Sequence, residues 1–168
     1  MRRWTLALLA IAAPALAVPL TITKSVTMIS DPLGSLVPRS VPGAIADYKT
    51  RADNPLGNVG RAVTDILMVE NLPANVDLRV ADLNPGKGPV EFSDGAVLGL
   101  GASGLVYGYT SLTAPADALE FSSGTGWTYQ PVADADGYDH NVRAIRVKLT
   151  QNFATSTSFQ LRYRVRIR

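Results

Sequence analysis

Hydrophobic and polar residues alternate without a break over residues 159–168, which read FQLRYRVRIR. The apolar positions are Phe159, Leu161, Tyr163, Val165 and Ile167, and four of the five positions between or after them are arginines. A period of two is the period of a β-strand, and no helical register would gather these five apolar side chains on one side. The pattern therefore predicts a strand with one buried apolar face and one basic face.

The same alternation recurs in short segments along most of the chain. Strands are expected over residues 20–28, 44–52, 62–71, 76–80, 90–92, 105–109, 119–122, 127–130, 142–150 and 158–168. Fourteen glycines and eleven prolines mark the turns between these segments and leave little room for long helices. The expected fold is all-β, a single Ig-like or Greek-key β-sandwich of about nine or ten strands over residues 18–168.

Three details of this sandwich follow from the pattern. Residues 142–150 and 158–168 flank a polar turn, so we expect them to pair as a hairpin that places their basic residues on one sheet. Residues 62–71 are almost continuously apolar, which is typical of a strand buried on both faces. Residues 119–122 and 127–130 flank a glycine-rich turn and are expected to form another hairpin.

Residues 1–17 differ from the rest of the chain. An Arg-Arg pair precedes an apolar run over residues 4–13, and an A-x-A end follows at Ala15 and Ala17. These features are typical of a cleaved secretory signal peptide, and the run is short for a membrane-spanning helix. We expect an exported protein with no transmembrane segment after leader removal; the alternative is a retained anchor helix.

The composition excludes several kinds of chemistry. The chain has no cysteine, which removes disulfides, thiolate metal sites and cysteine nucleophiles. Its one histidine, His140, has no set of partners for a serine triad or a zinc site. The glycine-rich residues 95–104 lack the spacing of a phosphate-binding loop. We expect a protein that is not an enzyme and that has no cofactor other than, at most, calcium.

An acidic turn is the candidate calcium site. Asp134, Asp136 and Asp139 lie close together around Gly137, and carboxylate oxygens are ligands that calcium prefers. Their spacing departs from that of the EF-hand loop, which needs a closing glutamate. Calcium binding and a plain acidic turn between strands both stay open.

Charge is unevenly distributed along the chain. Without the two leader arginines the mature chain would hold 14 basic and 14 acidic residues. Residues 139–168 hold seven basic residues against Asp139 alone, a net charge of +6, which leaves the rest of the mature chain at −6. Such segregation indicates either internal pairing of opposite charges or contact between copies of the chain.

The basic residues that we expect on one sheet form the candidate interface. They are Arg146, Lys148, Arg162, Arg164, Arg166 and Arg168. Three interpretations stay open: a solvated face that protects an edge strand, docking against the acidic part of a neighbouring copy, or binding of an anionic polysaccharide. Nucleic acid is not an expected partner, because the stripe lacks interleaved exposed aromatic residues.

Several segments resemble a known family. LTITKSV at residues 20–26, PGAIADY at 42–48, DNPLGN at 53–58 and ENLPANV at 70–76 follow the order found in the conserved repeat domain of bacterial cell-surface proteins, number eleven among the domains of unknown function. The chain resembles this family over most of residues 20–76. The resemblance implies a sandwich in an exported surface protein with a structural or adhesive role.

Lys24 and Glu70 fall on the expected inward faces of residues 20–28 and 62–71. An unpaired charge in that position would be costly, so we expect a buried Lys24–Glu70 ion pair. Two alternatives stay open. Some surface sandwiches of the kind that the chain resembles form a Lys–Asn isopeptide bond, and Lys24 could instead reach water at the rim of the sandwich.

The expected function is that of an exported, non-catalytic structural protein of the bacterial cell surface. We expect it to self-assemble, by strand or face docking, into an extracellular filament, matrix or surface layer. A strand near either end of the mature chain could be donated to the sheet edge of a neighbour. The alternative is a surface binding module, or adhesin, that holds anionic glycans on its arginine-rich face.

Overall fold

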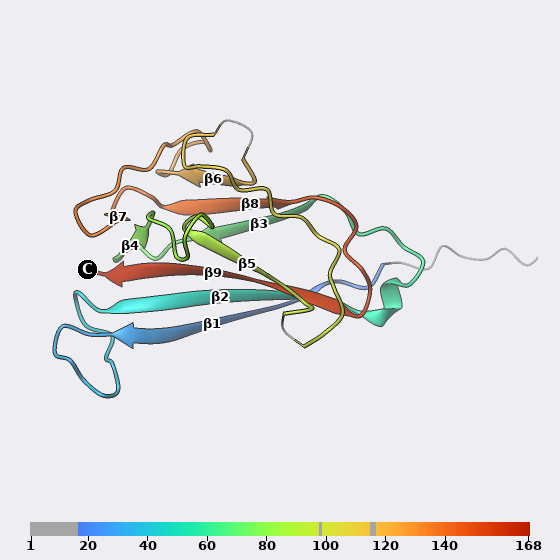
Figure 1. The fold of residues 1–168 in the computed structure, drawn as a ribbon, viewed down its shortest axis with the longest axis horizontal. Helices are drawn as coiled ribbons and strands as arrows, with labels where there is room; N and C mark the ends of the chain where they lie inside the picture. Colours follow the sequence, from blue (N-terminus) through green and yellow to red (C-terminus); the bar gives the residue numbers. More distant parts are fainter. Residues whose placement is uncertain (1–16, 98, 115–116) are drawn as a thin grey trace, which may run out of the picture.

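The chain folds into two antiparallel β-sheets that face each other around a shared core (Figure 1). The computed structural model describes residues 17–97, 99–114 and 117–168, so the predicted leader lies, apart from Ala17, outside the described residues. The strands are β1 (Thr21–Ser30), β2 (Ile45–Asn54), β3 (Ile66–Asn71), β4 (Val76–Arg79), β5 (Val90–Asp94), β6 (Leu119–Ser122), β7 (Tyr138–Asp139), β8 (Ala144–Leu149) and β9 (Thr157–Ile167), and the 3-10 helix η1 spans Leu56–Asn58.

The two sheets differ in size. The larger sheet has six strands in the order β1-β2-β9-β4-β7, with β5 also paired to β9. The smaller sheet has three strands in the order β3-β8-β6. The prediction of an all-β sandwich is therefore confirmed, and most predicted strands lie within a few residues of an observed one.

The strand predicted from the opening pattern, β9, lies in the middle of the larger sheet. Along one edge it pairs with β2 over ten residue pairs, and along the other it pairs with β5 and then with β4. Its inward side chains are almost completely buried, at 0–1% exposed for Phe159, Leu161, Tyr163 and Val165. The interpretation that its charges protect an edge strand is wrong, because β9 has a neighbour on both sides.

The predicted hairpin between residues 142–150 and 158–168 is also wrong. β8 pairs with β3 and β6 in the smaller sheet, whereas β9 belongs to the larger sheet. The connecting segment crosses between the sheets, and its Phe153 is fully buried in the core. Backbone bonds from Phe153 N to Val63 O (2.8 Å) and from Ala154 N to Ser103 O (2.8 Å) tie this segment to other loops.

Three further expectations need correction. β3 is an edge strand, and its Leu67 and Val69 are about half exposed, so it is not buried on both faces. Residues 105–109 contribute only an isolated bridge, Val106↔Thr150, and residues 127–130 only the bridge Phe121↔Tyr129. The short β7 was not expected, because a strand of two residues leaves no periodic pattern.

Removal of the Phe153 ring is expected to destabilise the fold. The ring packs edge-on against Phe159 at a centroid distance of 5.3 Å and is 0% exposed, so Phe153→Ala should lower the free energy of unfolding by about 3–5 kcal/mol. Urea denaturation followed by circular dichroism measures this loss. Val132→Ala, at a side chain that is 74% exposed, is the control and should change stability by less than about 0.5 kcal/mol. Equal effects of the two substitutions would contradict the inter-sheet role of Phe153.

Candidate functional site

The outer face of the larger sheet carries the predicted arginine row of β9. The outward residues of β9 are opposed by Asp47 on β2, Asp77 on β4 and Glu91 on β5, since directly paired residues share a face. Each of the four arginines of the row contacts at least one carboxylate: Arg162 (Asp47, Glu91), Arg164 (Asp47), Arg166 (Asp77, Asp134, Asp136) and Arg168 (Asp77). The acidic partners thus lie on the same face as the arginines.

Asp47 is the most buried acid of this face, with its side chain only 4% exposed. Arg164 binds it in a two-point contact, Nε to Oδ1 at 2.6 Å and Nη2 to Oδ2 at 3.0 Å, and Arg162 Nη1 donates to Oδ2 at 2.8 Å. Desolvation alone would raise the pKa of Asp47, but the hydrogen bonds and charges of Arg164 and Arg162 outweigh it and hold the pKa below its ordinary value. Asp47 is therefore ionised at neutral pH, and both of its carboxylate oxygens accept hydrogen bonds from arginines.

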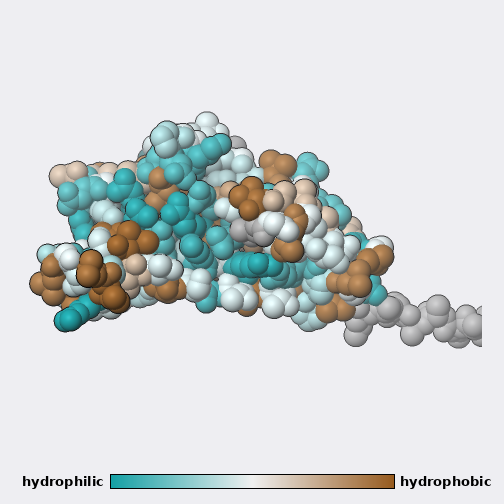
Figure 2. Space-filling model, turned by 60° about the horizontal axis from the view of Figure 1, so that its bottom comes forward, coloured by the Kyte–Doolittle hydropathy of each residue, from teal (hydrophilic) through white to brown (hydrophobic). Residues whose placement is uncertain are grey.

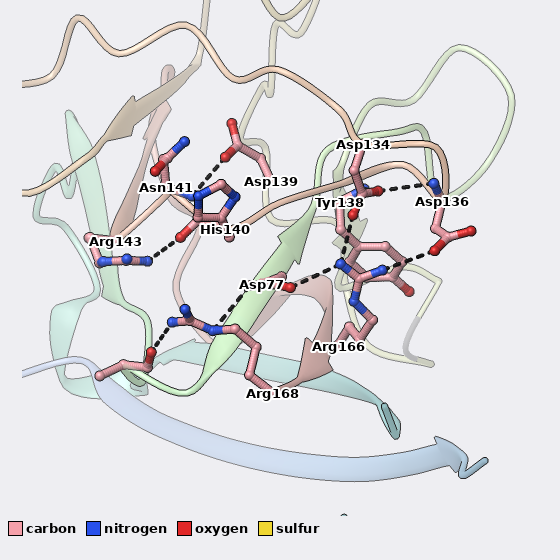
Figure 3. A network of polar contacts seen from close by, with 11 residues as sticks. Asp77, Asp134, Asp136, Tyr138, Asp139, His140, Asn141, Arg143, Arg166 and Arg168 are labelled. Carbon is pink, nitrogen blue, oxygen red and sulfur yellow. Dashed lines mark hydrogen bonds and ion pairs between the residues drawn. The ribbon is translucent and has the colours of Figure 1, made fainter. Parts of the chain in front are cut away.

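Arg166 is the centre of a second cluster at the end of the same row (Figure 3). Its guanidinium contacts Asp77 on β4 at 3.0 Å, and Asp134 and Asp136 of the acidic turn at 2.7 and 3.1 Å. It also lies over the ring of Tyr138, 4.6 Å from the ring centroid. The backbone N–H of Tyr138 and the side chain of Arg166 lower the pKa of Asp134.

The candidate calcium ligands are not brought together around one point. Asp134 and Asp136 face Arg166, whereas Asp139 accepts bonds from Tyr129 Oη (2.9 Å) and from the backbone N–H of Val132 (2.8 Å). Across residues 17–97, 99–114 and 117–168, no group of three or more acidic or histidine side chains is arranged to hold a metal ion. The geometry is that of an acidic turn whose charge is matched by an arginine.

Arg146 and Lys148 do not share a sheet with the arginine row. They lie on β8 of the smaller sheet, where both contact Glu120 of the neighbouring β6, at 2.5 and 2.7 Å. Arg146 also lies over the ring of Trp127, 4.6 Å from the ring centroid. The six residues predicted as one interface are therefore divided between two sheets, because the expected hairpin does not form.

The segregation of charge along the sequence is thus matched inside the folded chain. Six basic residues from the positively charged segment all have carboxylate partners from the rest of the chain or from the acidic turn. Of the two explanations that the charge pattern allowed, this arrangement is internal pairing. The four acids of the strands, Asp47, Asp77, Glu91 and Glu120, were not singled out from the sequence, although each stands at an outward position of an alternating segment.

Lys24 of the larger sheet and Glu70 of the smaller sheet are in contact with each other. Lys24 Nζ binds Glu70 Oε2, Thr50 Oγ1 donates to Glu70 Oε1 at 2.5 Å, and the ammonium lies 5.4 Å from the centroid of the Tyr48 ring. Glu70 is buried, whereas the Lys24 side chain is 40% exposed, so the pair lies at the rim and only its acid is buried. The contact joins β1 of the larger sheet to β3 of the smaller one.

β1 is the exposed edge of the larger sheet. Nine of its ten residues are exposed, and within the described part of the chain it pairs with β2 alone. Its inward side chains include Ile22 and Val26, 51% and 50% exposed, on either side of Lys24. Figure 2, in which the β1 side of the molecule comes forward, shows apolar side chains gathered at the end of this edge where the loop between β1 and β2 lies.

One carboxylate, that of Asp31, orders the first part of that loop, residues 31–44. Asp31 accepts bonds from the backbone N–H groups of Leu33, Ser35 and Arg39 at 2.8–3.1 Å. These bonds, that of Arg39 first, lower the pKa of Asp31 to about 2. The ordered loop presents Leu33, Leu36 and Val37 to solvent, each at least 69% exposed, which is an unusual concentration of exposed apolar side chains.

Comparisons with known proteins identify no relative: no family model, no curated protein and no solved structure matches the chain. No helix among the described residues is long and apolar enough to cross a membrane. The function therefore has to be inferred from the geometry of the site.

Loss of the Asp47 charge is expected to remove a pH-dependent part of the stability. The pKa of Asp47 is lower when folded than its ordinary value of 3.8. Its contribution is therefore complete above about pH 4 and is lost as the pH falls through the folded-state value. Asp47→Asn should lower the free energy of unfolding by about 2–3 kcal/mol at pH 7, and the difference from the unsubstituted protein should shrink towards pH 2.

Urea denaturation at a series of pH values measures both effects. Asp53→Asn is the matched control, because Asp53 pairs with Arg51 at the surface with side chains 32% and 39% exposed, and it should change stability by less than about 1 kcal/mol. A constant difference between Asp47→Asn and the unsubstituted protein across pH 2–7 would show that the ionised form of Asp47 is not what the arginines stabilise.

Proposed function

We propose that the protein is an exported, non-catalytic structural subunit of the bacterial cell surface that associates with copies of itself through the edge strand β1. The observation that carries this proposal is a ten-residue edge strand with nine exposed residues and a half-exposed apolar inner row. Exposed sheet edges are templates for pairing with another chain, and soluble proteins usually block them. β1 therefore offers a surface for assembly.

Few of the usual means of blocking an edge are present on β1. The strand contains no proline, its one charged residue is Lys24, and the bulge between Met28 and Ser30 lies at one end. An inward-pointing lysine ordinarily discourages a second strand, but the Lys24 ammonium is already paired with Glu70. A neighbouring strand would not have to accommodate an unpaired charge.

A second copy of the chain fits this edge. If two β1 strands pair antiparallel about Ser25, Ile22 of one copy lies opposite Met28 of the other on the inner face, and Thr23 lies opposite Thr27 on the outer face. Apolar pairs and threonine pairs at directly opposed positions are favourable in sheets. A two-fold contact of this kind uses the same patch on both copies, so the strand is complementary to itself.

The last strand, β9, is a poor candidate for donation to a neighbour. It lies between β2 on one side and β4 and β5 on the other, and its inward side chains fill the core. Its removal would expose that core. Of the two strands near the ends of the mature chain, only β1 lies at an edge within the described residues.

The alternative, binding of anionic glycans on the arginine row, has less support from this geometry. All four arginines of β9 already hold carboxylates, and Asp47 and Asp77 beneath them are buried. An anionic ligand would have to displace these partners and leave the buried acids unpaired, which is costly. The resemblance to the surface-protein repeat domain implies a structural role, and the resembling segments include parts of β1, β2 and β3.

Substitution of the inner row of β1 is expected to weaken self-association. Ile22→Lys and Val26→Lys together add two charges to the edge, and since both side chains are about half exposed the fold should tolerate them. Sedimentation velocity across a wide concentration range should show association of the unsubstituted protein and at least a roughly tenfold weaker association of the variant. Val132→Lys, at another exposed apolar side chain, is the control and should associate normally. Monomers at every protein and salt concentration would refute the proposal.

A further inference from the structure

A groove of about 350 Å³ lies between β5, the turn over residues 82–88 and the segment over residues 105–109. This volume falls within the range of small-molecule sites, about 300–1,000 Å³. The groove is remote in sequence from β1 and includes none of the basic residues discussed above. Its lining side chains include Asn84, Lys87, Glu91, Phe92, Tyr107 and Tyr109.

Aromatic rings form one wall of the groove. Tyr107 and Tyr109 project from the same side of an extended segment, with ring centroids 6.3 Å apart and planes inclined by only 17°. Phe92 packs against Tyr107 at 6.2 Å and against the fully buried Phe159 at 5.9 Å. The wall is therefore anchored to the core by a continuous series of ring contacts, and its two tyrosines are only partly buried.

The position of the Tyr109 ring depends on a glycine. Gly88 has a positive φ of 75°, and a Cβ added there would lie 2.5 Å from Tyr109 Cε1. The ring therefore lies directly against the backbone of the turn, where a side chain on residue 88 would displace it. The turn itself is ordered by bonds from Lys87 N to Asn84 O (3.0 Å) and from Gly86 N to Asp82 Oδ2 (2.9 Å).

The polar groups of the lining are fixed in position. Glu91 accepts a bond from Asn84 Nδ2 at 2.8 Å and another from Arg162 Nε at 2.5 Å. The carboxylate is thereby held by two neighbours, and its charge is matched by the arginine. Lys87 adds an ammonium to the same lining, so the groove combines ring faces with amide, carboxylate and ammonium groups.

We propose that this groove binds a neutral carbohydrate. The apolar face of a pyranose ring would stack on Tyr107 and Tyr109, and its hydroxyls would bond to Asn84, Glu91 and Lys87. Tyrosine suits such a ligand because it offers a ring face and a polar tip together. An aliphatic ligand would instead desolvate these polar groups without replacing their hydrogen bonds to water, which is unfavourable. This inference does not depend on self-association through β1.

Saturation-transfer NMR and calorimetry with three neutral hexasaccharides, cellohexaose, chitohexaose and maltohexaose, test the proposal on the purified protein. We expect binding of at least one of them, and an affinity at least roughly tenfold lower in Tyr109→Ala. Gly88→Ala should also weaken binding, because the added methyl group would displace the Tyr109 ring. Asn84→Ala, on the exposed turn, is a second variant that removes a polar contact without removing a ring.

Trp127→Ala is the matched control, because Trp127 is also a partly buried aromatic residue but lies beside Arg146 on β8. It should bind the hexasaccharide as the unsubstituted protein does, and circular dichroism confirms that each variant is folded. Absence of binding of all three hexasaccharides at millimolar concentration would overturn the proposal. Binding that persists unchanged in both Tyr109→Ala and Asn84→Ala would overturn it as well, since the ligand would then bind elsewhere.

Discussion

The central position of β9 is the constraint on which the rest of the structure depends. One face of the strand fills the core, and the other holds arginines above two buried carboxylates, Asp47 and Asp77. A slip by one residue would turn the arginines into the core, and a slip by two would separate Arg164 from Asp47, which are directly paired across β2 and β9. The ion pairs therefore fix the register of β2, β4 and β5 on β9. We infer that their main effect is on specificity, since buried ion pairs add little net stability compared with apolar residues.

Much of the fold could be predicted because the alternation of side chains is a local property. The boundaries of β1, β2, β4, β8 and β9 follow from short stretches of sequence. The pairing partners of the strands do not follow from such stretches. The pattern of residues 142–150 is the same whether the strand pairs with β9 or with β3. The decisive feature was Phe153, whose burial takes the connecting segment across the core, and a lone aromatic residue in a polar turn carries no such signal. Likewise, an apolar run suits a strand buried on both faces, but β3 is an edge whose outer side chains are half exposed.

The candidate site was predicted less well than the fold, for a physical reason. Net charge along a segment says nothing about distances in space, and Arg162 and Asp47 are 115 positions apart in sequence yet 2.8 Å apart in the structure. The arginines were conspicuous because they stand together in one strand. Three of their acidic partners, Asp47, Asp77 and Glu91, stand singly in three different strands, so no local window shows them as a set. Asp134 and Asp136 do stand together in the sequence, but their pattern does not show that they face Arg166. Lys24 and Glu70 could be matched from sequence only because each is a lone charge on an apolar face.

The difference in strand number between the sheets explains why β1 is exposed. The three strands of the smaller sheet do not cover the whole inner face of the larger one, and the uncovered part falls at β1, where Ile22 and Val26 stay half exposed. The Lys24–Glu70 contact spans the gap that a fourth strand beside β3 would fill, and Thr50 and Tyr163 hold the same carboxylate from β2 and β9. This tie fixes the edge of the larger sheet relative to the smaller one. A rigid edge loses less conformational entropy when it pairs with another strand than a frayed one does, so the Lys24–Glu70 contact would also favour the self-association that we propose for β1.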